Sequence, residues 1–366
     1  MIAKRQARLA RLRERMADAD VGAVLLSLGA DLPWLTGYEA MPLERLTMAV
    51  VPADGKATLV VPRLEAPRVV ADPDVFDLRA WSEHEDPVKI VAALVGERER
   101  LAVSDRTWAT FVLALQATLP GAKWVPASRL TGPLRAVKDL DEVEALAAAS
   151  AAADLVAAAL LGGDIPLIGR SEREVSADIS RRLIDAGHQK VNFAIVASGP
   201  NSASPHHEPS RRQIRAGEAV VCDFGGTLDG YCSDITRTVW TGPPGSFEEH
   251  VYKVVQQAQA AGVQAARTGA TCEEVDAAAR LVIADAGFGE FFIHRTGHGI
   301  GVEEHEDPYI VGGNSEAVVA GNAFSVEPGV YLPGRFGVRI EDVVVADPAG
   351  PRSLNTATRD MVIVEV

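Results

Sequence analysis

Short apolar segments alternate with helical stretches along the first part of the chain. Uninterrupted apolar runs of this kind predict strands that are buried on both faces, and the helical stretches between them predict an α/β layer. The runs are GAVLLSL at 22–28, TMAVVPA at 47–53, KATLVVPR at 56–63 and LAVSD at 101–105.

The first twenty residues carry a helical pattern, in which Leu9, Leu12 and Met16 recur at helical spacing. Acidic residues interrupt the basic run and no apolar signal core follows, so this segment is expected to be the first helix of a domain and not a transit peptide. Residues 31–38, DLPWLTGY, are expected to form a loop at an interface, although core packing is the favoured role for Trp34.

The pattern changes near residues 131–138, TGPLRAVK, which mark the expected domain boundary. A Gly-Pro pair interrupts the pattern, and a long Ala-rich helix is expected to begin near Asp139. A chain of 366 residues is long enough for one small and one large domain. We therefore expect an N-terminal α/β domain at 1–135 and a second domain at 136–366.

The second part of the chain repeats one order of motifs. Two helical stretches, 171–187 and 271–287, each open with a capping box and close on a glycine. Each is followed by a His-x-x-Pro motif and then by two strands that carry an acid. The matched residues are His206 and His305, Pro209 and Pro308, Asp223 and Glu327, and Asp234 and Glu341. This order indicates an internal duplication, and an approximate two-fold between the repeats would bring the four acids together.

The local pattern at the first pair of acids predicts a β-hairpin. The Asp-Gly dipeptide at 229–230 predicts a two-residue type I′ turn, which pairs Gly225 with Asp234. Asp223 then lies on the same face of the hairpin as Asp234. A bulge at the glycine pair 225–226 is the alternative, and it would change this register.

Composition and charge exclude several classes of protein. The net charge of −14 argues against nucleic acid as a partner, since phosphate backbones are bound by clustered Lys and Arg. No run approaches the roughly 18 uncharged apolar residues of a membrane span, so no membrane partner is expected. The three cysteines show no CxxC spacing, which fits a reducing, cytoplasmic location better than secretion.

Four carboxylates in a largely apolar sheet are too costly to bury unless their pKa values rise or cations lie among them. We therefore expect two divalent ions, with His298 as a fifth ligand because the glycines on both sides of it allow close backbone approach. Carboxylates with a single imidazole favour manganese, iron or cobalt over the ligands of structural zinc. The alternative is a solvated hairpin whose acids face water, with His298 as a core histidine.

These residues resemble the five metal ligands of the pita-bread metallopeptidases. They are Asp223, Asp234 eleven residues later, His298 in GHGIG, Glu327 in VEPG and Glu341 in RIED. The resemblance covers essentially the whole chain and is closest to the prolidase and Xaa-Pro aminopeptidase branch, because methionine aminopeptidases usually lack an N-terminal domain. It implies an α+β fold, in which a smaller creatinase-type α/β domain precedes a pita-bread (creatinase/aminopeptidase) catalytic domain built from a duplicated half.

The resemblance implies a role for each ligand. Asp223 would bind one ion, His298 and Glu327 the other, and Asp234 and Glu341 both. Glu327 would also accept a proton from the attacking water. The ions would be manganese or cobalt, with iron and zinc as the other candidates.

The resemblance also implies catalytic residues outside the ligand set. His206 and His305 are similar to two family histidines that bind substrate and stabilise an oxyanion, the alternative being ordinary loop histidines. Arg339 is expected to orient a ligand by hydrogen bonding. Arg295 is open between a substrate carboxylate and a structural salt bridge, and Cys232 between an oxidation-sensitive neighbour of the metals and a core residue.

The function that the resemblance implies is hydrolysis of Xaa-Pro bonds at the free amino end of short peptides, by an Xaa-Pro dipeptidase (prolidase). The first alternative is an Xaa-Pro aminopeptidase that acts on longer peptides. The second is a pseudo-enzyme that serves as a binding scaffold, which would be expected to lack some of the acids. Family members commonly form homodimers in which the N-terminal domain covers the partner's cleft, so the Trp34 segment is a candidate lid.

Overall fold

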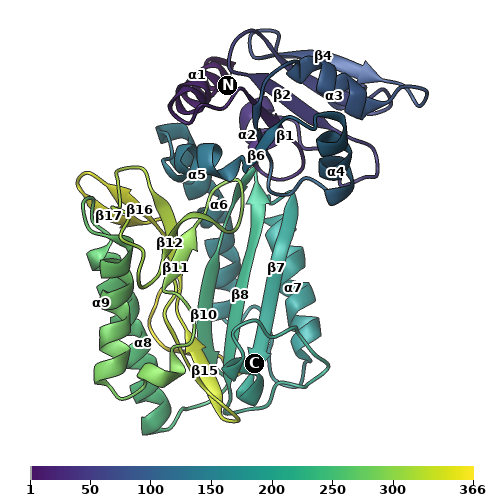
Figure 1. Ribbon diagram of the computed structural model, residues 1–366. Coiled ribbons are helices and arrows are strands. Elements are labelled where there is room, and N and C mark those ends of the chain that lie inside the picture. The colour runs from purple at the N-terminus through teal and green to yellow at the C-terminus, as the bar shows by residue number, and fades with distance from the viewer. Residues whose placement is uncertain (1) are drawn as a thin grey trace. The chain divides into compact units, whose positions relative to one another are not determined.

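The structure is a computed structural model that describes residues 2–366, with side chains from Lys4 onward. The chain forms two compact units, residues 1–135 and 136–366 (Figure 1).

The N-terminal unit is built on a six-stranded mixed sheet with the strand order β4-β3-β2-β1-β5-β6. Its strands are β1 Ala23–Leu26, β2 Met48–Pro52, β3 Ala57–Pro62, β4 Phe76–Trp81, β5 Arg100–Val103 and β6 Lys123–Pro126. Its helices are α1 Ile2–Asp18, α2 Asp31–Thr36, the short 3₁₀ turn η1 Ala66–Arg68, α3 Pro87–Val95, α4 Ala109–Thr118 and α5 Ser128–Ala136. The four strands predicted from apolar runs and the first helix are confirmed.

Two strands of this sheet were not predicted from the sequence. β4 and β6 lie at the two edges of the sheet, where strands carry polar side chains such as Arg79 and Lys123 and show no apolar run. The predicted loop at 31–38 is also wrong, because residues 31–36 form helix α2 and proline is tolerated in its first turn. Trp34 lies in that helix with 1% of its surface exposed, so its side chain belongs to the core of this unit and cannot serve as a lid.

The C-terminal unit contains two five-stranded sheets that follow the predicted repeat and a two-stranded sheet in the second repeat. The first repeat holds α6 Leu140–Leu161, α7 Glu172–Asp185, β7 Lys190–Ser198, η2 Gly199–Ala203, β8 Ala219–Leu228, β9 Tyr231–Cys232 and β10 Ile235–Trp240. The second holds α8 Ser246–Ala265, α9 Cys272–Asp285, η3 Gly289–Phe291, β11 Gly297–Gly299, β12 Glu306–Ile310, β13 Ala323–Val326, β14 Gly329–Leu332, β15 Phe336–Arg339, β16 Asp342–Asp347 and β17 Gly350–Ser353, and β18 Val362–Ile363 returns to the first sheet.

The repeated helices are matched at both ends. α7 and α9 have 14 residues each and begin with capping boxes, from Ser171 and Thr271 respectively. Both helices are followed by a glycine with positive φ, Gly187 and Gly287. Helices α6 and α7 pack on the sheet β18-β10-β8-β7, and α8 and α9 on the sheet β12-β11-β13-β16-β17. Each repeat is therefore a sheet with its own helical layer (Figure 1).

The predicted hairpin register is also observed. Thr227 pairs with Cys232 and Phe224 pairs with Ile235, so the register is the same on both sides of the glycine pair 225–226. The irregularity lies on the other neighbour of β8, since the β7 register shifts between Val191 and Phe193. The hairpin is therefore unbulged at the glycine pair, and Asp223 lies on the predicted face.

Helix α6 begins after the capping box of Asp139, as the sequence predicted. By length and composition alone this helix could cross a membrane, but 56% of its most apolar 18-residue stretch is buried inside the structure. It also carries the buried Asp154, which accepts hydrogen bonds from Asn355 and from the Thr356 hydroxyl at 3.3 and 2.8 Å. These contacts make α6 the central core helix of the first repeat.

Candidate metal centre

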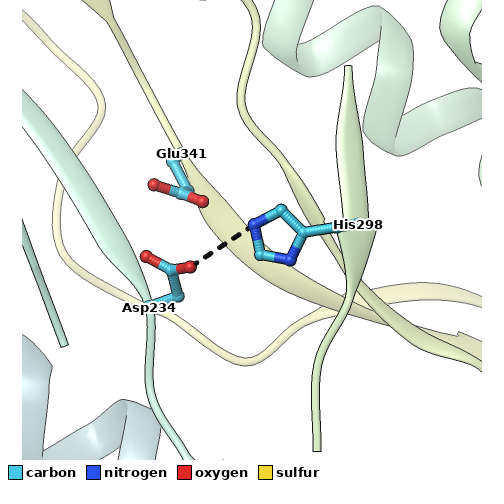
Figure 2. Close-up of side chains that lie close together, drawn as sticks. All are labelled: Asp234, His298 and Glu341. Carbon is cyan, nitrogen blue, oxygen red and sulfur yellow. Dashed lines mark ion pairs between the residues drawn. The ribbon is translucent and has the colours of Figure 1, made fainter. Parts of the chain in front are cut away.

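Four acids and one histidine from five separate strands or strand ends gather between the two sheets of the C-terminal unit. Asp223 lies in β8, Asp234 precedes β10, His298 lies in β11, Glu327 follows β13 and Glu341 precedes β16. Ligand atoms of Asp234, His298 and Glu341 all lie within 4.8 Å of one another, and their side chains point into one small space (Figure 2). Nε2 of His298 is 3.7 Å from Oδ2 of Asp234 and 3.2 Å from Oε1 of Glu327.

The acids strongly perturb one another. Burial raises the pKa of Asp234 and of Glu341 well above the ordinary range, and repulsion from the neighbouring carboxylates raises both further. Burial also raises the pKa of Asp223, where the guanidinium of Arg339 opposes the shift. Burial raises the pKa of Glu327 too, but its hydrogen bond to His298 and the charge of that ring outweigh the effect and hold it at about 2. The cluster is thus short of positive charge.

The imidazole of His298 is oriented for binding a cation. Its Nδ1 lies 3.2 Å from the carbonyl oxygen of Gly299. Because a carbonyl only accepts hydrogen bonds, this contact places a proton on Nδ1 and leaves Nε2 directed toward the acids, where a bound cation would take the place of a proton on that nitrogen.

The glycines beside His298 are required by space. A Cβ atom on Gly297 would lie 1.8 Å from the carbonyl oxygen of Ser325, and one on Gly299 would lie 2.2 Å from that of Asp307. The expectation that these glycines permit close backbone approach is therefore confirmed, and the approach brings β11 against β13 and β12.

These donors fit a divalent cation. Oδ1 of Asp223 is buried without a hydrogen-bond partner among the described residues, an arrangement that costs free energy unless another group binds it. Nε2 of His298 faces the same acids. Carboxylate oxygens with one imidazole are a donor set that suits divalent metals of the first transition series.

Arg339 holds two of the acids at once. It donates from Nη2 to Asp223 at 2.5 Å and from Nε to the hydroxyl of Thr236 at 3.1 Å. That hydroxyl in turn donates to Oε2 of Glu341 at 2.5 Å. Sequence reasoning selected Arg339 but missed Thr236, although Thr236 lies two residues after Asp234 and therefore on the same face of the strand.

A second network supports Arg339 from behind. Its Nη1 donates to the hydroxyl oxygen of Tyr331 at 2.8 Å, and that hydroxyl lies 2.8 Å from Nε2 of His294. Nδ1 of His294 lies 2.7 Å from the carbonyl oxygen of Arg295, so Nδ1 carries the proton and Nε2 accepts from Tyr331. Burial lowers the pKa of His294, which favours this neutral form. The network fixes the plane of the guanidinium beside the acids.

The two predicted catalytic histidines border the cluster. The ring centroid of His305 is 3.9 Å from that of His298, and burial together with the charges of His298 and Arg295 lowers its pKa to about 4. His206 is exposed on the segment that follows β7, directly after Pro205, whose carbonyl oxygen accepts a hydrogen bond from Nη1 of Arg339 at 3.2 Å. All the residues selected from the sequence therefore lie at or beside one site.

The two open assignments are resolved in part. Arg295 lies with Nη2 at 3.5 Å from Nδ1 of His305 and stacks over the ring of Tyr309 at 4.5 Å. Within residues 2–366 no carboxylate forms an ion pair with Arg295, so the structural salt bridge is not observed. Cys232 is buried, and burial raises the pKa of its thiol to about 12, so the core role is the one that its surroundings support.

Fold and site together define a protein that gathers acids from two repeats into a cation-binding centre. Comparison with known proteins identifies the family. Residues 143–348 match the model of metallopeptidase family M24, and residues 8–137 match the creatinase/prolidase N-terminal domain. The chain belongs to this family, in its prolidase branch, and has its pita-bread fold.

Individual relatives are similar over nearly their whole length. A probable dipeptidase PepE of Mycobacterium bovis is 43% identical, over 98% of this chain and 96% of that protein. An Xaa-Pro dipeptidase of Lactobacillus helveticus is 35% identical, over 98% and 99% respectively. The crystal structure of dipeptidase PepE from Mycobacterium ulcerans superposes with a TM-score of 0.92 at 43% identity, covering 99% of this chain and 98% of that one.

Proposed function

We propose that this protein is an Xaa-Pro dipeptidase whose two divalent metal ions are held by the buried acid cluster. The observation that carries the proposal is the convergence of four acids and His298 with too little positive charge to balance them. Asp223 would hold one ion, His298 and Glu327 the other, and Asp234 and Glu341 both. We propose manganese or cobalt, and iron and zinc are the other metals that this donor set accommodates.

Divalent ions at this position would lower the pKa of a bound water towards 7 and polarise the scissile carbonyl. The residues of the chain contribute the rest. The carboxylate of Glu327, held ionised beside His298, is able to accept a proton. His206 and His305 border the cluster, where an N–H of either ring can donate to a carbonyl oxygen that gains negative charge. Arg339 fixes Asp223 and, through Thr236, fixes Glu341.

The position of Arg295 supports a dipeptide, and not a longer peptide, as the substrate. Its guanidinium lies beside His305, at the border of the cluster, and no carboxylate of the described chain pairs with it. The free carboxylate of a two-residue substrate matches the two parallel N–H donors of a guanidinium. Proline in the second position offers no N–H, which suits a site that binds the ends of the substrate and not the peptide nitrogen.

The two alternative functions predict different results with peptide substrates. An Xaa-Pro aminopeptidase would cleave longer peptides at least as well as dipeptides. A pseudo-enzyme scaffold would bind peptides without hydrolysis, but this chain retains all five ligand positions and both histidines.

Two further proposals concern the protein in the cell. We propose a homodimer, in which a part of the N-terminal domain other than Trp34 covers the partner's site. We also propose a cytoplasmic location, which the three free, buried cysteines support.

The test is a comparison of rates on Ala-Pro and Ala-Pro-Ala after chelation, with and without added manganese or cobalt. Metal-dependent cleavage of Ala-Pro alone is the expected result. Preference for the tripeptide would select the aminopeptidase, and binding without cleavage of either peptide would select the scaffold.

A further inference from the structure

A buried glutamate outside the acid cluster holds the segment that carries His206. Glu172 is the first residue of α7, and its side chain is fully buried. Every hydrogen bond that its carboxylate accepts comes from residues 198–210. The donors are the backbone N–H of Ser198 at 2.8 Å and its hydroxyl at 2.9 Å, Nδ2 of Asn201 at 3.0 Å, Nε2 of His207 at 2.8 Å, and the backbone N–H of Ser210 at 3.1 Å and its hydroxyl at 2.6 Å.

The same segment reaches the acid cluster at its other side. The carbonyl oxygen of Pro205, next to His206, accepts a hydrogen bond from Nη1 of Arg339 at 3.2 Å. The hydroxyl of Ser202 accepts from the backbone N–H of Gly337 in β15 at 2.8 Å. The segment therefore spans from Glu172 to the arginine that binds Asp223, and His206 lies between these two anchors.

The internal repeat shows that helix docking alone does not need this carboxylate. Cys272 is the first residue of α9 and occupies the position of Glu172 in the second repeat. Both residues donate a backbone hydrogen bond to the segment that follows, Glu172 to Arg212 at 3.0 Å and Cys272 to Glu316 at 2.9 Å. The Cys272 side chain packs in an apolar cluster instead. The first repeat has thus added a buried charge to a contact that the second repeat makes without one.

The buried charge is well compensated. Burial raises the pKa of Glu172, but the hydrogen bonds from Ser210, Ser198, His207 and Asn201 outweigh it and lower the pKa to about 2. The carboxylate therefore remains a pure acceptor throughout the neutral range, and each donor around it depends on that state.

We propose that Glu172 is a positioning residue, which holds segment 198–210 so that His206 meets the substrate at the metal centre. The expected effect on catalysis rests on the proposed function, because it requires the proposed substrate. The expected effect on segment 198–210 does not, because it can be measured without catalysis.

The first test is a double-mutant cycle in the full-length, metal-saturated protein. Glu172→Gln keeps the size of the side chain but turns an amide donor toward the existing donors. We expect kcat/KM for Ala-Pro to fall on the order of 10–100-fold, since misplacement of a binding group by about 1 Å costs up to 100-fold. In the His206→Ala background the same change is expected to cost less than about twofold, because coupled residues are not additive. Equal losses in both backgrounds would overturn the proposal.

The matched control is Glu174→Gln. Glu174 lies in the same first turn, is exposed, and caps the helix through Ser171 without contacting segment 198–210. Its activity is expected to stay within about twofold of the unmodified protein.

The second readout is hydrogen exchange of the backbone amides at 198–212. Glu172→Gln is expected to speed exchange there and leave the interior of α7 unchanged, whereas unchanged exchange in the segment would refute the proposal. If this variant does not fold, Ser210→Ala and Asn201→Ala remove single donors and should show smaller changes in the same segment. Failure of the unmodified protein to cleave Ala-Pro would refute the proposed function. The hydrogen-exchange result would still decide whether Glu172 holds segment 198–210.

Discussion

Arg339 donates a hydrogen bond from Nη2 to Oδ2 of Asp223 over 2.5 Å, and so joins a strand of the second repeat to an acid of the first. The same guanidinium contacts the hydroxyls of Thr236 and Tyr331. Its planar fork of donors serves these three partners and the carbonyl oxygen of Pro205, whereas an ammonium group is a single point of charge.

Arg339→Lys is therefore expected to lower metal affinity or activity by roughly 10–100-fold, the usual effect of losing a partner that orients a ligand. The measurement is a titration of activity with manganese after chelation. Arg335→Lys is the matched control, because Arg335 is half exposed and lies in the turn that joins β14 to β15, the strand that carries Arg339. An unchanged metal titration for Arg339→Lys would show that the contact with Asp223 does not orient a ligand.

Asp234→Asn is expected to have opposite effects with and without metal. Removing a carboxyl group that is costly to bury among other acids should raise the melting temperature of the metal-free protein by a few degrees, about 1 kcal/mol for a unit of this size. Added manganese should then stabilise the unmodified protein but not the variant, whose activity should fall more than the roughly 10–100-fold expected for an outer contact. Calorimetric melting with and without manganese checks both effects.

Asp229→Asn is the control for that experiment, since Asp229 is an exposed turn residue of the same hairpin. A metal-free Asp234→Asn protein that melts below the unmodified one would mean that the acids do not repel one another as described.

His188 is expected to make stability depend on pH near neutrality. Burial lowers the pKa of this histidine below its ordinary value of 6.5, and Nε2 accepts from the hydroxyl of Ser233 at 2.9 Å. The unfolded chain takes up a proton near that ordinary value and the folded chain only at lower pH, so stability is lost as pH falls below about 6.5.

His188→Gln should flatten this dependence, which melting temperatures between about pH 5 and 7.5 would show. His84→Gln, at an exposed position of the N-terminal unit, should leave the slope unchanged. Equal slopes for His188→Gln and the unmodified protein would contradict the expectation.

Gly297→Ala is expected to disrupt the strand that carries His298. The added methyl group would overlap the carbonyl oxygen of Ser325, and overpacking costs about 1–3 kcal/mol or more. Melting temperature and manganese-restored activity should both fall. Gly312→Ala, where the nearest atom is 3.7 Å away, should change neither.

Arg295→Gln tests the choice of a dipeptide. If the guanidinium binds the substrate carboxylate, the variant should lose on the order of 10–100-fold in kcat/KM on Ala-Pro, the value of a charged hydrogen bond of roughly 1.5–3 kcal/mol. It should lose little on Ala-Pro amide, which has no such carboxylate. Parallel losses on both substrates would assign Arg295 a role unrelated to that group.

The sequence predicted those parts of the fold that local patterns control. Apolar runs identified the central strands, capping boxes identified α7 and α9, and the Asp-Gly turn gave the register that brings Asp223 and Asp234 to one face. The edge strands β4 and β6 have polar residues and no apolar run, so no local pattern announced them. Helix α2 was not predicted because its short sequence contains a proline.

The site divides in the same way. The acids and His298 stand in distinctive short motifs, whereas Tyr331 and Glu172 act through partners far away in sequence. Glu172 looked like an ordinary acid in the first turn of a helix. Only the folded chain shows that segment 198–210 surrounds its carboxylate.

The contribution of both repeats to one cluster has a consequence for the origin of the protein. A chain with only one of the two repeats would carry two of the four acids, and could complete the cluster only by pairing with a second copy of itself. Fusion of two such copies would have allowed the two halves to diverge in sequence. His298 and Glu172, each of which is present in one half alone, are then results of that divergence.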